Sequence, residues 1–307
     1  MASVKFALHV LMFNCQDTIV GMLDNCGPFV DRIYVAYSRH PWKYNAKARN
    51  DVTNTTDKEI IKQSKYYGKI ELIEGQWDYD EDQRNACLSK AKHDGFDYLI
   101  IQDADEFYHP QDYRKNIEEI KANPGYEIYR TPWYCFWKNL NYVVVNETGA
   151  PIVGYPEFAV NCKTDVKFVR ARTTDARKEY TLPGLCYHLS YVMPDEALWL
   201  KINTWSHSHQ FDVKRWYRRK WLKWNESVKD LHPVDPPSWS RAVKFEGRLP
   251  PELEGRFSNQ GEAYRPGRWE IFENCREGAA DFSAAAGRKM RGLMRRIKSL
   301  MRPERQP

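Results

Sequence analysis

The sequence predicts an α/β protein with a mainly parallel sheet, helices on both faces of that sheet, and a C-terminal subdomain of helical and irregular structure. Two observations support this fold class. Short apolar runs alternate with polar, helix-like stretches over about the first hundred residues, the pattern of strands joined by crossover helices. From about residue 124 the runs become aromatic instead, and prolines gather beyond residue 232.

The first half provides four expected strands and three expected helices. The strands are the apolar, β-rich runs at 5–13, 32–36, 69–73 and 98–102. The helices are the stretches at 17–26, 57–67 and 81–94, each of which begins with an acidic residue that suits the positive end of a helix dipole. Ligands of such sheets bind beyond the carboxyl ends of the strands. The residues directly after each strand are therefore the first place to search for a site.

The second half predicts fewer and more widely spaced elements. Strands are expected at 155–169 and 185–193, and a helix at 195–203. We expect a main domain over 1–212, a basic and aromatic subdomain over 213–287, and a cationic tail over 288–307.

The charge of the chain is concentrated at its end. The sequence has 47 Lys and Arg against 41 Asp and Glu, a formal net charge of +6. Eight of the basic residues and one acidic residue fall in 288–307, so this tail carries +7 and the rest of the chain −1. Within it, Met290, Leu293, Met294, Ile297, Leu300 and Met301 form an apolar stripe if the tail is helical. Such a helix suits an anionic membrane surface, and a disordered tail or a nucleic-acid arm is the alternative.

Composition and cysteine usage indicate the compartment. A hydrophobic content of 42% fits a globular protein and excludes an integral membrane protein. Seven scattered cysteines without a C-x-x-C pair argue against a disulfide framework or a thiolate zinc site. We expect a cytoplasmic protein, with the tail allowing peripheral attachment at the inner face of the membrane.

Two carboxylates end the fourth expected strand. Asp103 and Asp105 stand one residue apart after the apolar run 98–101, and side chains at i and i+2 of an extended segment point to the same side. Two converging carboxylates suit Mg²⁺ or Mn²⁺, which complete their shells with water and phosphate oxygens. The metal would neutralise charge that develops on a diphosphate leaving group. The alternative is a solvated acidic turn.

The residues around this pair carry a family resemblance. The helix at 83–91 reads Gln-Arg-Asn-Ala-Cys-Leu-Ser-Lys-Ala, Gly95-Phe96 follow, and the next strand leads into Asp-Ala-Asp-Glu-Phe. This ordered set resembles the family 2 glycosyltransferases of the GT-A fold, a Rossmann-like fold, and is similar to the branch found in bacterial surface-polysaccharide and phage enzymes. The resemblance covers about residues 4–110 well and extends more weakly to about 210. It implies a nucleotide-sugar-binding half over 1–110 and an acceptor half over 111–212.

The resemblance also implies roles for particular residues. Those implied in donor binding are Phe13, Asn14, Asp17, Tyr37 or Ser38, Arg84 and Asp103. The residues of the first loop and those after the second strand would hold base and ribose, and Arg84 would lie near the pyrophosphate or the donor sugar. Asp103 and Asp105 would bind ribose and metal. The alternatives are a helix N-cap for Asn14 and Asp17, and a surface ion pair for Arg84.

Other residues are implied in completing the site. His188, in Cys-Tyr-His-Leu-Ser-Tyr, resembles the late histidine that serves as a third metal ligand, although a histidine at a strand end can also be structural. Acceptor contacts are expected from Lys201, His207, His209, Trp216 and Trp221.

The catalytic base is the least defined assignment. Glu157 stands where related sequences have a Pro-Asp or Pro-Glu pair, but the Arg that usually follows is replaced near that place by Asn161. Arg170 and Arg172 come later in the chain. We expect Glu157 to act as base, with Asp175 and Asp195 as alternatives. Asp105 is also expected to be essential for catalysis, through the metal that it binds.

The basic and aromatic run at 214–224 has two interpretations. Tyr217, Trp221 and Trp224 recur at i, i+4 and i+7 and so share one helical face. That face docks on the catalytic domain in the first interpretation. In the second, the rings stack on sugars or bases while the cations hold phosphates.

The sequence thus predicts a metal-dependent, inverting glycosyltransferase that uses Mn²⁺ or Mg²⁺ and moves a hexose or pentose from a nucleotide-diphosphate sugar to a glycan or lipid-linked saccharide. One alternative keeps the fold and donor but glycosylates a modified base of DNA. Another is a non-catalytic nucleotide- or lipid-binding module, against which the intact Asp103, Asp105 and Arg84 argue. A phosphatase of the Asp-x-Asp type is a fourth reading, but there the pair follows the first strand.

Overall fold

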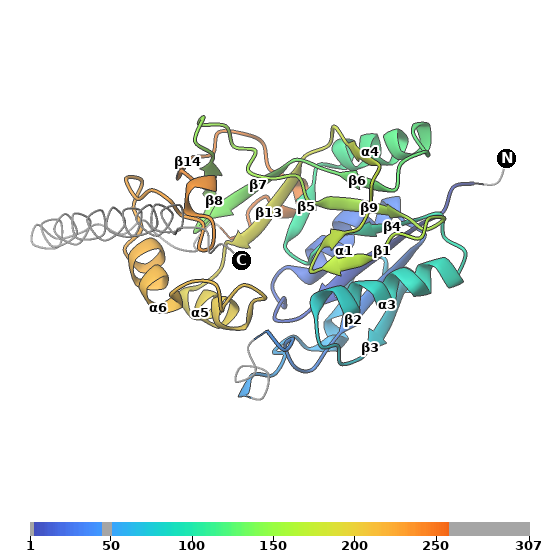
Figure 1. The fold of residues 1–307 in the computed structure, drawn as a ribbon, viewed down its shortest axis with the longest axis horizontal. Coiled ribbons are helices and arrows are strands. Elements are labelled where there is room, and N and C mark those ends of the chain that lie inside the picture. Colours follow the sequence, from blue (N-terminus) through green and yellow to red (C-terminus); the bar gives the residue numbers. More distant parts are fainter. Residues whose placement is uncertain (1–2, 45–50, 258–307) are drawn as a thin grey trace, which may run out of the picture. The chain divides into compact units, whose positions relative to one another are not determined.

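The larger sheet of the protein has seven strands and lies on the right of Figure 1. The computed structural model describes residues 3–44 and 51–257, which belong to one compact unit, Met1–Ala263. In order across the sheet the strands are β12 (Glu179–Thr181), β6 (Ile128–Arg130), β9 (Glu157–Asn161), β4 (Tyr98–Ile101), β1 (Phe6–Met12), β2 (Arg32–Tyr37) and β3 (Ile70–Glu74). The four strands β4, β1, β2 and β3 run parallel, and β9 pairs antiparallel with β4 and with β6. All four strands expected in the first half are confirmed.

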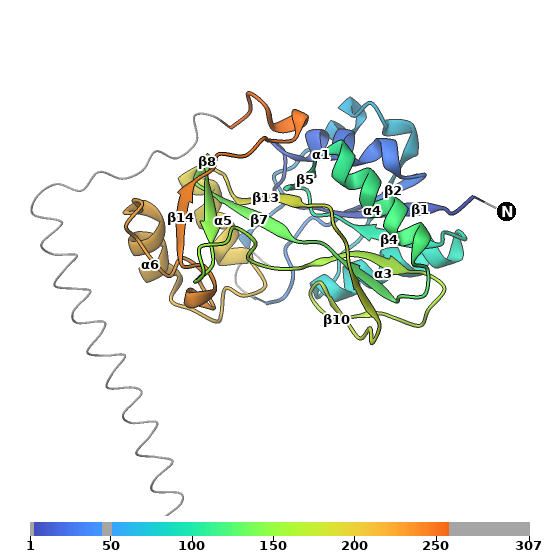
Figure 2. The ribbon, with the colours of Figure 1, turned by 90° about the horizontal axis from the view of Figure 1, so that it is seen from above.

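Helices cover both faces of this sheet, as Figure 2 shows. Alternate residues of a strand point to opposite faces, so Leu8 and Val10 of β1 pack in the core under α1 (Ile19–Cys26) and α4 (Pro110–Ala122). Ala7 packs in a second cluster with residues of α3 (Asp80–His93) on the other face.

The helix α3 has local reasons to begin where it does. Asp80, Glu81 and Asp82 lie in its first turn, where the helix dipole favours negative charge. The Tyr79 N–H donates to the Asp82 carboxylate over 3.2 Å and so satisfies a backbone group ahead of the helix.

The segment expected as a helix at 57–67 forms 3₁₀ turns instead, at Lys58–Gln63 and Tyr67–Lys69. Adjacent β-branched Ile60 and Ile61 lower its helix propensity. Ser64 ends the first turn, where its hydroxyl donates to Asp24 over 2.8 Å.

A second sheet of five strands lies beside the first. Its order is β14 (Arg241–Lys244), β8 (Asn139–Val145), β7 (Trp133–Trp137), β13 (Cys186–Tyr191) and β5 (Glu106–Tyr108). The chain leaves the first sheet at the end of β4, turns through Asp103–Asp105 and enters the second sheet as β5. The two carboxylates therefore lie at the junction of the two sheets. A small antiparallel pair, β10 (Phe168–Arg170) and β11 (Thr173–Thr174), completes the strands described.

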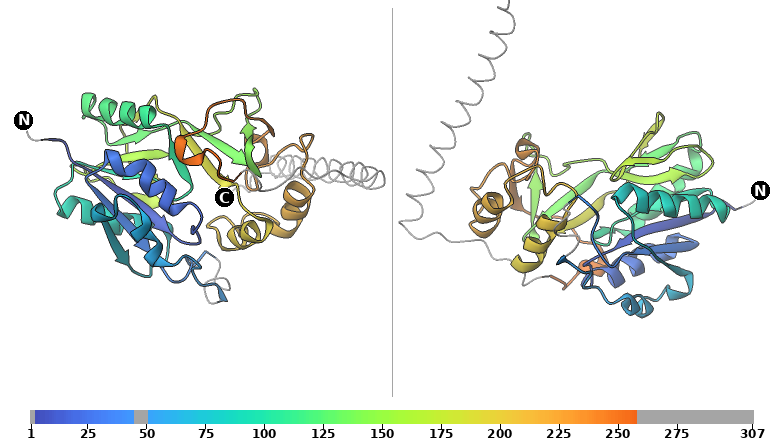
Figure 3. Two further views of the ribbon diagram at one scale, coloured as in Figure 1. Left: turned by 180° about the vertical axis from the view of Figure 1, so that it is seen from behind. Right: turned by 60° about the horizontal axis from the view of Figure 1, so that its bottom comes forward.

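A tryptophan-rich core holds the last described part of the chain against the second sheet. The helices α5 (Asp195–Thr204) and α6 (Val213–Trp216) and a π-helical turn at Tyr217–Leu222 lie beside that sheet (Figure 3). The side chains of Trp221 and Trp224 are fully buried and pack with Trp137. The docking interpretation of the 214–224 run is therefore confirmed. The boundary expected at 212 is not a break in packing, because this core joins residues from both of its sides.

The structure also bears on the expectations for the helix at 195–203, the tail, the cysteines and membrane insertion. The helix expected at 195–203 is confirmed as α5, whereas the tail at 288–307 lies outside the described residues. Six cysteines fall within the described part of the chain, and all six are free thiols. Among the helices of residues 3–44 and 51–257, none has the length and apolar character needed to cross a membrane.

Candidate active site

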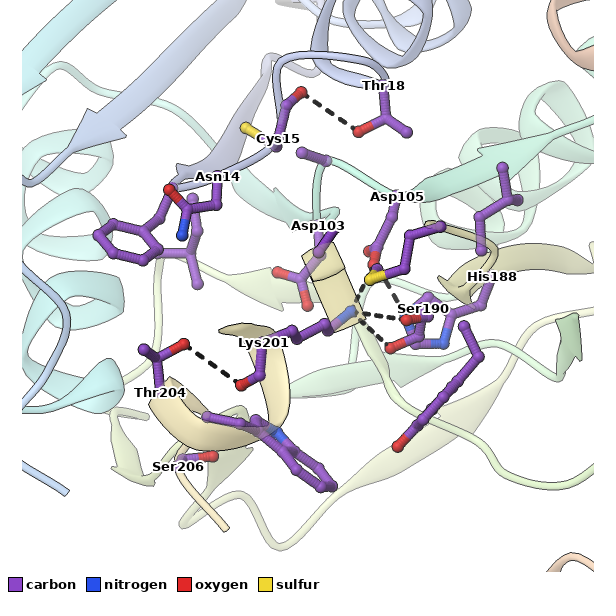
Figure 4. Close-up of a pocket in the computed structure, with 18 of the residues that line it drawn as sticks. Asn14, Cys15, Thr18, Asp103, Asp105, His188, Ser190, Lys201, Thr204 and Ser206 are labelled. Carbon is purple, nitrogen blue, oxygen red and sulfur yellow. Dashed lines mark hydrogen bonds and ion pairs between the residues drawn. The ribbon is translucent and has the colours of Figure 1, made fainter. Parts of the chain in front are cut away.

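A cavity of about 610 Å³ opens where the carboxyl ends of β1 and β4 meet the second sheet (Figure 4). Its volume is in the range of small-molecule sites. Its walls include the loops after β1 and β2, the turn after β4, the first turns of α3, the turn between β10 and β11, and the stretch from β13 through α5. The predicted site residues that line it are Phe13, Asn14, Asp17, Ser38, Arg84, Asp103, Asp105, His188, Lys201 and His207.

Asp103 is held by two guanidinium groups. Arg84, fully buried on α3, donates from Nη2 to one oxygen of Asp103 over 3.0 Å and from Nε to Asp80 over 2.7 Å. Arg172 lies 3.4 Å from the other Asp103 oxygen. Burial raises the pKa of Asp103, but the charges of Arg84 and Arg172 outweigh it and lower the pKa to about 2. Asp103 is thus ionised at neutral pH, and both its oxygens face arginines.

Arg172 is a central residue of the site, although the sequence analysis gave it no role. It lies in the turn between β10 and β11 and forms a two-pronged ion pair with Glu106, whose side chain is fully buried. Its guanidinium also donates to the carbonyl oxygens of Ile101, over 3.0 Å, and Glu157, over 2.6 Å. The arginine expected near Glu157 is thus present in space, supplied by a later segment. The only hint in the sequence was that the arginine of the family pattern is missing near Glu157, while Arg172 occurs later in the chain.

Asp105 faces a different pair of cations. One of its oxygens lies 3.4 Å from Nε2 of His188, and the other accepts a hydrogen bond from Nζ of Lys201 over 3.1 Å. The backbone oxygen of Asp105 accepts from the N–H of Leu189 over 2.8 Å, which fixes the turn to β13. Burial raises the pKa of Asp105, but the charges of Lys201 and His188 outweigh burial and hold it well below its usual range.

His188 is oriented by an aromatic neighbour. Its ring stacks on Trp133 with a centroid separation of 4.5 Å and an interplanar angle of 12°. Burial lowers the pKa of His188, but the Asp105 carboxylate outweighs this effect and raises the pKa to about 10. The imidazole is therefore protonated at neutral pH as the site stands, and it contributes a positive charge beside Asp105.

The expected metal ligands do not come together as a set of three. Among the residues that the structure describes, no group of three His, Cys, Asp or Glu side chains is arranged to hold a metal ion. Asp103 is engaged by arginines, and Lys201 lies against Asp105. Asp105 and His188 are the two expected ligands that remain adjacent. Carboxylate and imidazole groups suit Mn²⁺ chemically, but as a pair they form an incomplete site.

The loop after β1 is braced by a segment that the sequence analysis did not identify. Asn14 has a positive φ of 50°, and its side-chain oxygen accepts from the Thr55 N–H over 2.8 Å. The Asn54 side chain donates to the carbonyl oxygens of Met12, over 2.8 Å, and Ser38, over 2.9 Å. Asn54 thereby ties together the ends of β1 and β2. Asn14 thus shapes the loop in addition to lining the cavity.

The sequence did not predict that Trp42 lines the cavity. The indole N–H of Trp42 donates to the Gln83 side chain over 3.0 Å. A flat ring held in this way offers a stacking surface for a nucleobase.

Several predicted site residues lie away from the cavity. Tyr37 packs against the main core, and Ser38, its stated alternative, lines the cavity instead. His209 is exposed and does not line the cavity. Trp216 and Trp221 are buried in the tryptophan-rich core, so their rings cannot contact an acceptor. Their prediction as acceptor residues is corrected for this reason.

Glu157 also lies outside the cavity. Its buried side chain lies 3.0 Å from Nη2 of Arg130 on the neighbouring strand β6. Asp175 and Asp195, the alternatives, do not line the cavity either. A general base must reach the proton that it removes, so the structure does not support Glu157 in that role.

A family model of known proteins matches part of the chain. Residues 49–190 match the family described as Glycosyl transferase family 2. The matched region contains Arg84, Asp103, Asp105 and His188, which the cavity brings together. Over these residues the chain is similar to the family 2 glycosyltransferases, and the match supports a glycosyltransferase, as the resemblance in its sequence implied.

Solved structures show more distant likenesses. Residues 1–349 of TarS from S. aureus match with a TM-score of 0.39 and 14% identity, covering 72% of this chain and 71% of that one. The same TarS region in complex with UDP matches with a TM-score of 0.40 and 10% identity over 72% and 71%. A 4-diphosphocytidyl-2C-methyl-D-erythritol synthase from Anaerococcus prevotii matches with 0.34 and 12% over 59% and 87%. No curated protein sequence matches the chain.

Proposed function

We propose that the protein transfers a sugar from a nucleotide-diphosphate sugar to a hydroxyl group of a saccharide or lipid-linked saccharide. The observation that carries this proposal is the charge arrangement of the cavity. Four carboxyl groups and four basic groups interact at the cavity or directly behind its lining, and they carry no net formal charge when all are ionised: Asp80, Asp103, Asp105 and Glu106 with Arg84, Arg172, His188 and Lys201. A diphosphate that enters such a site meets fixed cations in a partly buried setting, where charge stabilisation is strong.

The donor would lie along the loop after β1. Phe13 and Trp42 offer rings to the base, and Ser38 and Asn14 offer polar groups to base or ribose. The diphosphate would lie toward Arg84, whose buried Nη1 has no hydrogen-bond partner among the described residues. A phosphate oxygen at that atom would satisfy an otherwise unpaired N–H.

A divalent cation, Mn²⁺ or Mg²⁺, is the cofactor expected from the sequence. Asp105 and His188 would hold it, and it would supply charge neutralisation for the leaving diphosphate. Lys201 already lies against Asp105, so an ion there would take the place of the ammonium group.

The acceptor would enter from the side of α5. Trp205 and His207 line the cavity there, with ring centroids 4.8 Å apart. Burial lowers the pKa of His207, so its imidazole is neutral at neutral pH. Its Nδ1 has no partner among the described residues. A neutral imidazole can remove the proton of an acceptor hydroxyl in an inverting transfer, and His207 replaces Glu157 as the proposed base.

Glycosylation of a modified DNA base keeps less support. The rings of Trp221 and Trp224, which would stack on bases in that reading, are buried.

Donor binding tests the proposed function directly. Nucleoside diphosphates and nucleotide sugars are each added with and without Mn²⁺, and the melting temperature is followed. A ligand at about 100 times its Kd stabilises the folded state by roughly 2.7 kcal/mol, so the true donor should stand out. Asp105→Asn should remove transfer while the fold is kept, and Asp165→Asn, at an exposed carboxylate, serves as its control. A panel without any nucleotide-dependent shift would overturn the proposal.

A further inference from the structure

The ammonium group of Lys201 sits in a site made of oxygens. It donates to Asp105 Oδ2 over 3.1 Å, to Ser190 Oγ over 2.8 Å and to the Ser190 carbonyl oxygen over 3.0 Å. An ammonium group has three N–H donors, and each of them has a partner here. Figure 4 shows the Lys201 side chain extending from α5 toward Asp105 and Ser190.

This arrangement is the kind of setting that a hard metal ion would use. A carboxylate, a hydroxyl and a carbonyl oxygen converge on one point, and His188 lies 3.4 Å from the same carboxylate. Oxygen ligands of these types suit Mg²⁺ and Mn²⁺. The point on which they converge is occupied by Nζ of Lys201, a residue that follows Asp105 by 96 positions in the chain.

The position of Lys201 relative to the cavity gives the ammonium group a second role. Lys201, Asp105 and Arg84 all line the same cavity, and the side chain of Lys201 is 32% exposed. A fixed positive charge at this place therefore faces any diphosphate that the cavity holds. Because its hydrogen bonds already orient it, the group needs little reorganisation when the ligand arrives.

We propose that Lys201 is a built-in cation of the donor site: its ammonium group takes the position of the divalent metal beside Asp105 and supports diphosphate binding without one. This inference deepens the proposed function and rests on it. A divalent ion reaches Asp105 and Ser190 only when the ammonium group leaves. Lys201 thus acts on the donor, and not on the acceptor as its place in the sequence suggested.

Two variants separate charge from space. Lys201→Met keeps the length of the side chain and fills the site without charge, whereas Lys201→Ala removes the charge and leaves the oxygens of Asp105 and Ser190 open. Two measurements are made on each protein. Binding of Mn²⁺ alone is measured by the electron paramagnetic resonance signal of the free ion. Binding of UDP, GDP, CDP and dTDP is measured by calorimetry, once in EDTA and once in Mn²⁺. Lys201→Arg keeps the charge and serves as the conservative variant.

The expected pattern differs for each protein. The wild type binds its nucleoside diphosphate in EDTA, and both neutral variants lose about tenfold or more of that affinity, the usual effect of removing a charged hydrogen-bonding partner. Lys201→Ala binds Mn²⁺ at least about tenfold more tightly than the wild type and regains nucleotide affinity with it, by the same size of interaction. Lys201→Met gains neither, and Lys201→Arg keeps binding in EDTA.

Two results would overturn the inference. Nucleotide binding by the wild type that disappears in EDTA would show that a metal, and not Lys201, provides the cation, while the proposed function would stand. Equal Mn²⁺ affinity in the wild type and Lys201→Ala would show that the ammonium group does not occupy the metal position. Absence of nucleotide binding in every protein, with and without Mn²⁺, would overturn the proposed function and this inference together.

Discussion

Replacing Arg172 by methionine should destabilise the protein more than almost any other single change in the site. The substitution keeps the length of the side chain and removes the charge that faces Glu106. That carboxylate is fully buried, and the other groups that contact Arg172 are Asp103 and the carbonyl oxygens of Ile101 and Glu157.

The size of the effect follows from these contacts. Removing one partner of a buried ion pair costs about 3–5 kcal/mol, because the remaining charge has no compensation. Two carbonyl oxygens lose a hydrogen bond in addition, each with a net value of about 0.5–1.5 kcal/mol. We therefore expect Arg172→Met to lower the free energy of unfolding by about 4–8 kcal/mol. Glu106→Gln in the same chain should recover at least about 2 kcal/mol, since it removes the unpaired charge.

Urea unfolding followed by tryptophan fluorescence measures these changes, and the chain has 11 tryptophans. Arg170→Met is the matched control, because Arg170 lies two residues away and is exposed, and it should change stability by less than about 0.5 kcal/mol. A loss below about 1 kcal/mol for Arg172→Met, or no recovery with Glu106→Gln, would refute the account of the buried ion pair.

The remaining predictions concern pH and the catalytic base. Burial lowers the pKa of Lys138 to about 8, despite the Asp195 carboxylate 3.4 Å away and the Trp221 ring below the ammonium group. Below pH 8 the charged Lys138 destabilises the folded state, and this destabilisation disappears as the pH rises from 8 to 10.5, because the folded state loses the proton first. Between pH 7 and 10.5 the free energy of unfolding of the wild type should therefore rise by about 3 kcal/mol relative to that of Lys138→Met. Unfolding curves at both pH values decide this, and a constant difference contradicts it. Glu157→Gln should keep kcat/KM within about twofold, whereas His207→Gln should lower kcat by about 10²–10⁴ and leave the Kd of the donor unchanged. Initial rates and calorimetry test both, and the reverse pattern would restore Glu157 as base.

The local pattern of the sequence was sufficient for much of the fold. Alternation of apolar runs with helix-like stretches placed the four strands β1 to β4, because side-chain period and propensity act over a few neighbouring residues. The same reasoning placed Asp103 and Asp105 at the end of a buried strand. It was wrong at 57–67, where adjacent β-branched residues and a side-chain contact with Asp24 favour 3₁₀ turns.

Long-range pairing decided the rest of the site. Arg172 and Glu106 are 66 positions apart in the chain, and no periodic signal connects them. The role of Glu157 as base was predicted wrongly for the same reason. Its side chain pairs with Arg130 on a neighbouring strand, and no local pattern in the sequence indicates that pairing. The aromatic residues of the 214–224 run could have faced either an acceptor or the protein, and only the packing with Trp137 shows which.

The sequence by itself determined the family 2 glycosyltransferase resemblance, the strands and the two carboxylates at the end of β4. Only the tertiary structure decided which charges meet those carboxylates: two arginines at Asp103, and a histidine and a lysine at Asp105. The physical reason is that helix and strand formation depend on nearby residues, whereas the electrostatics of a cavity depend on side chains that folding brings together from distant segments.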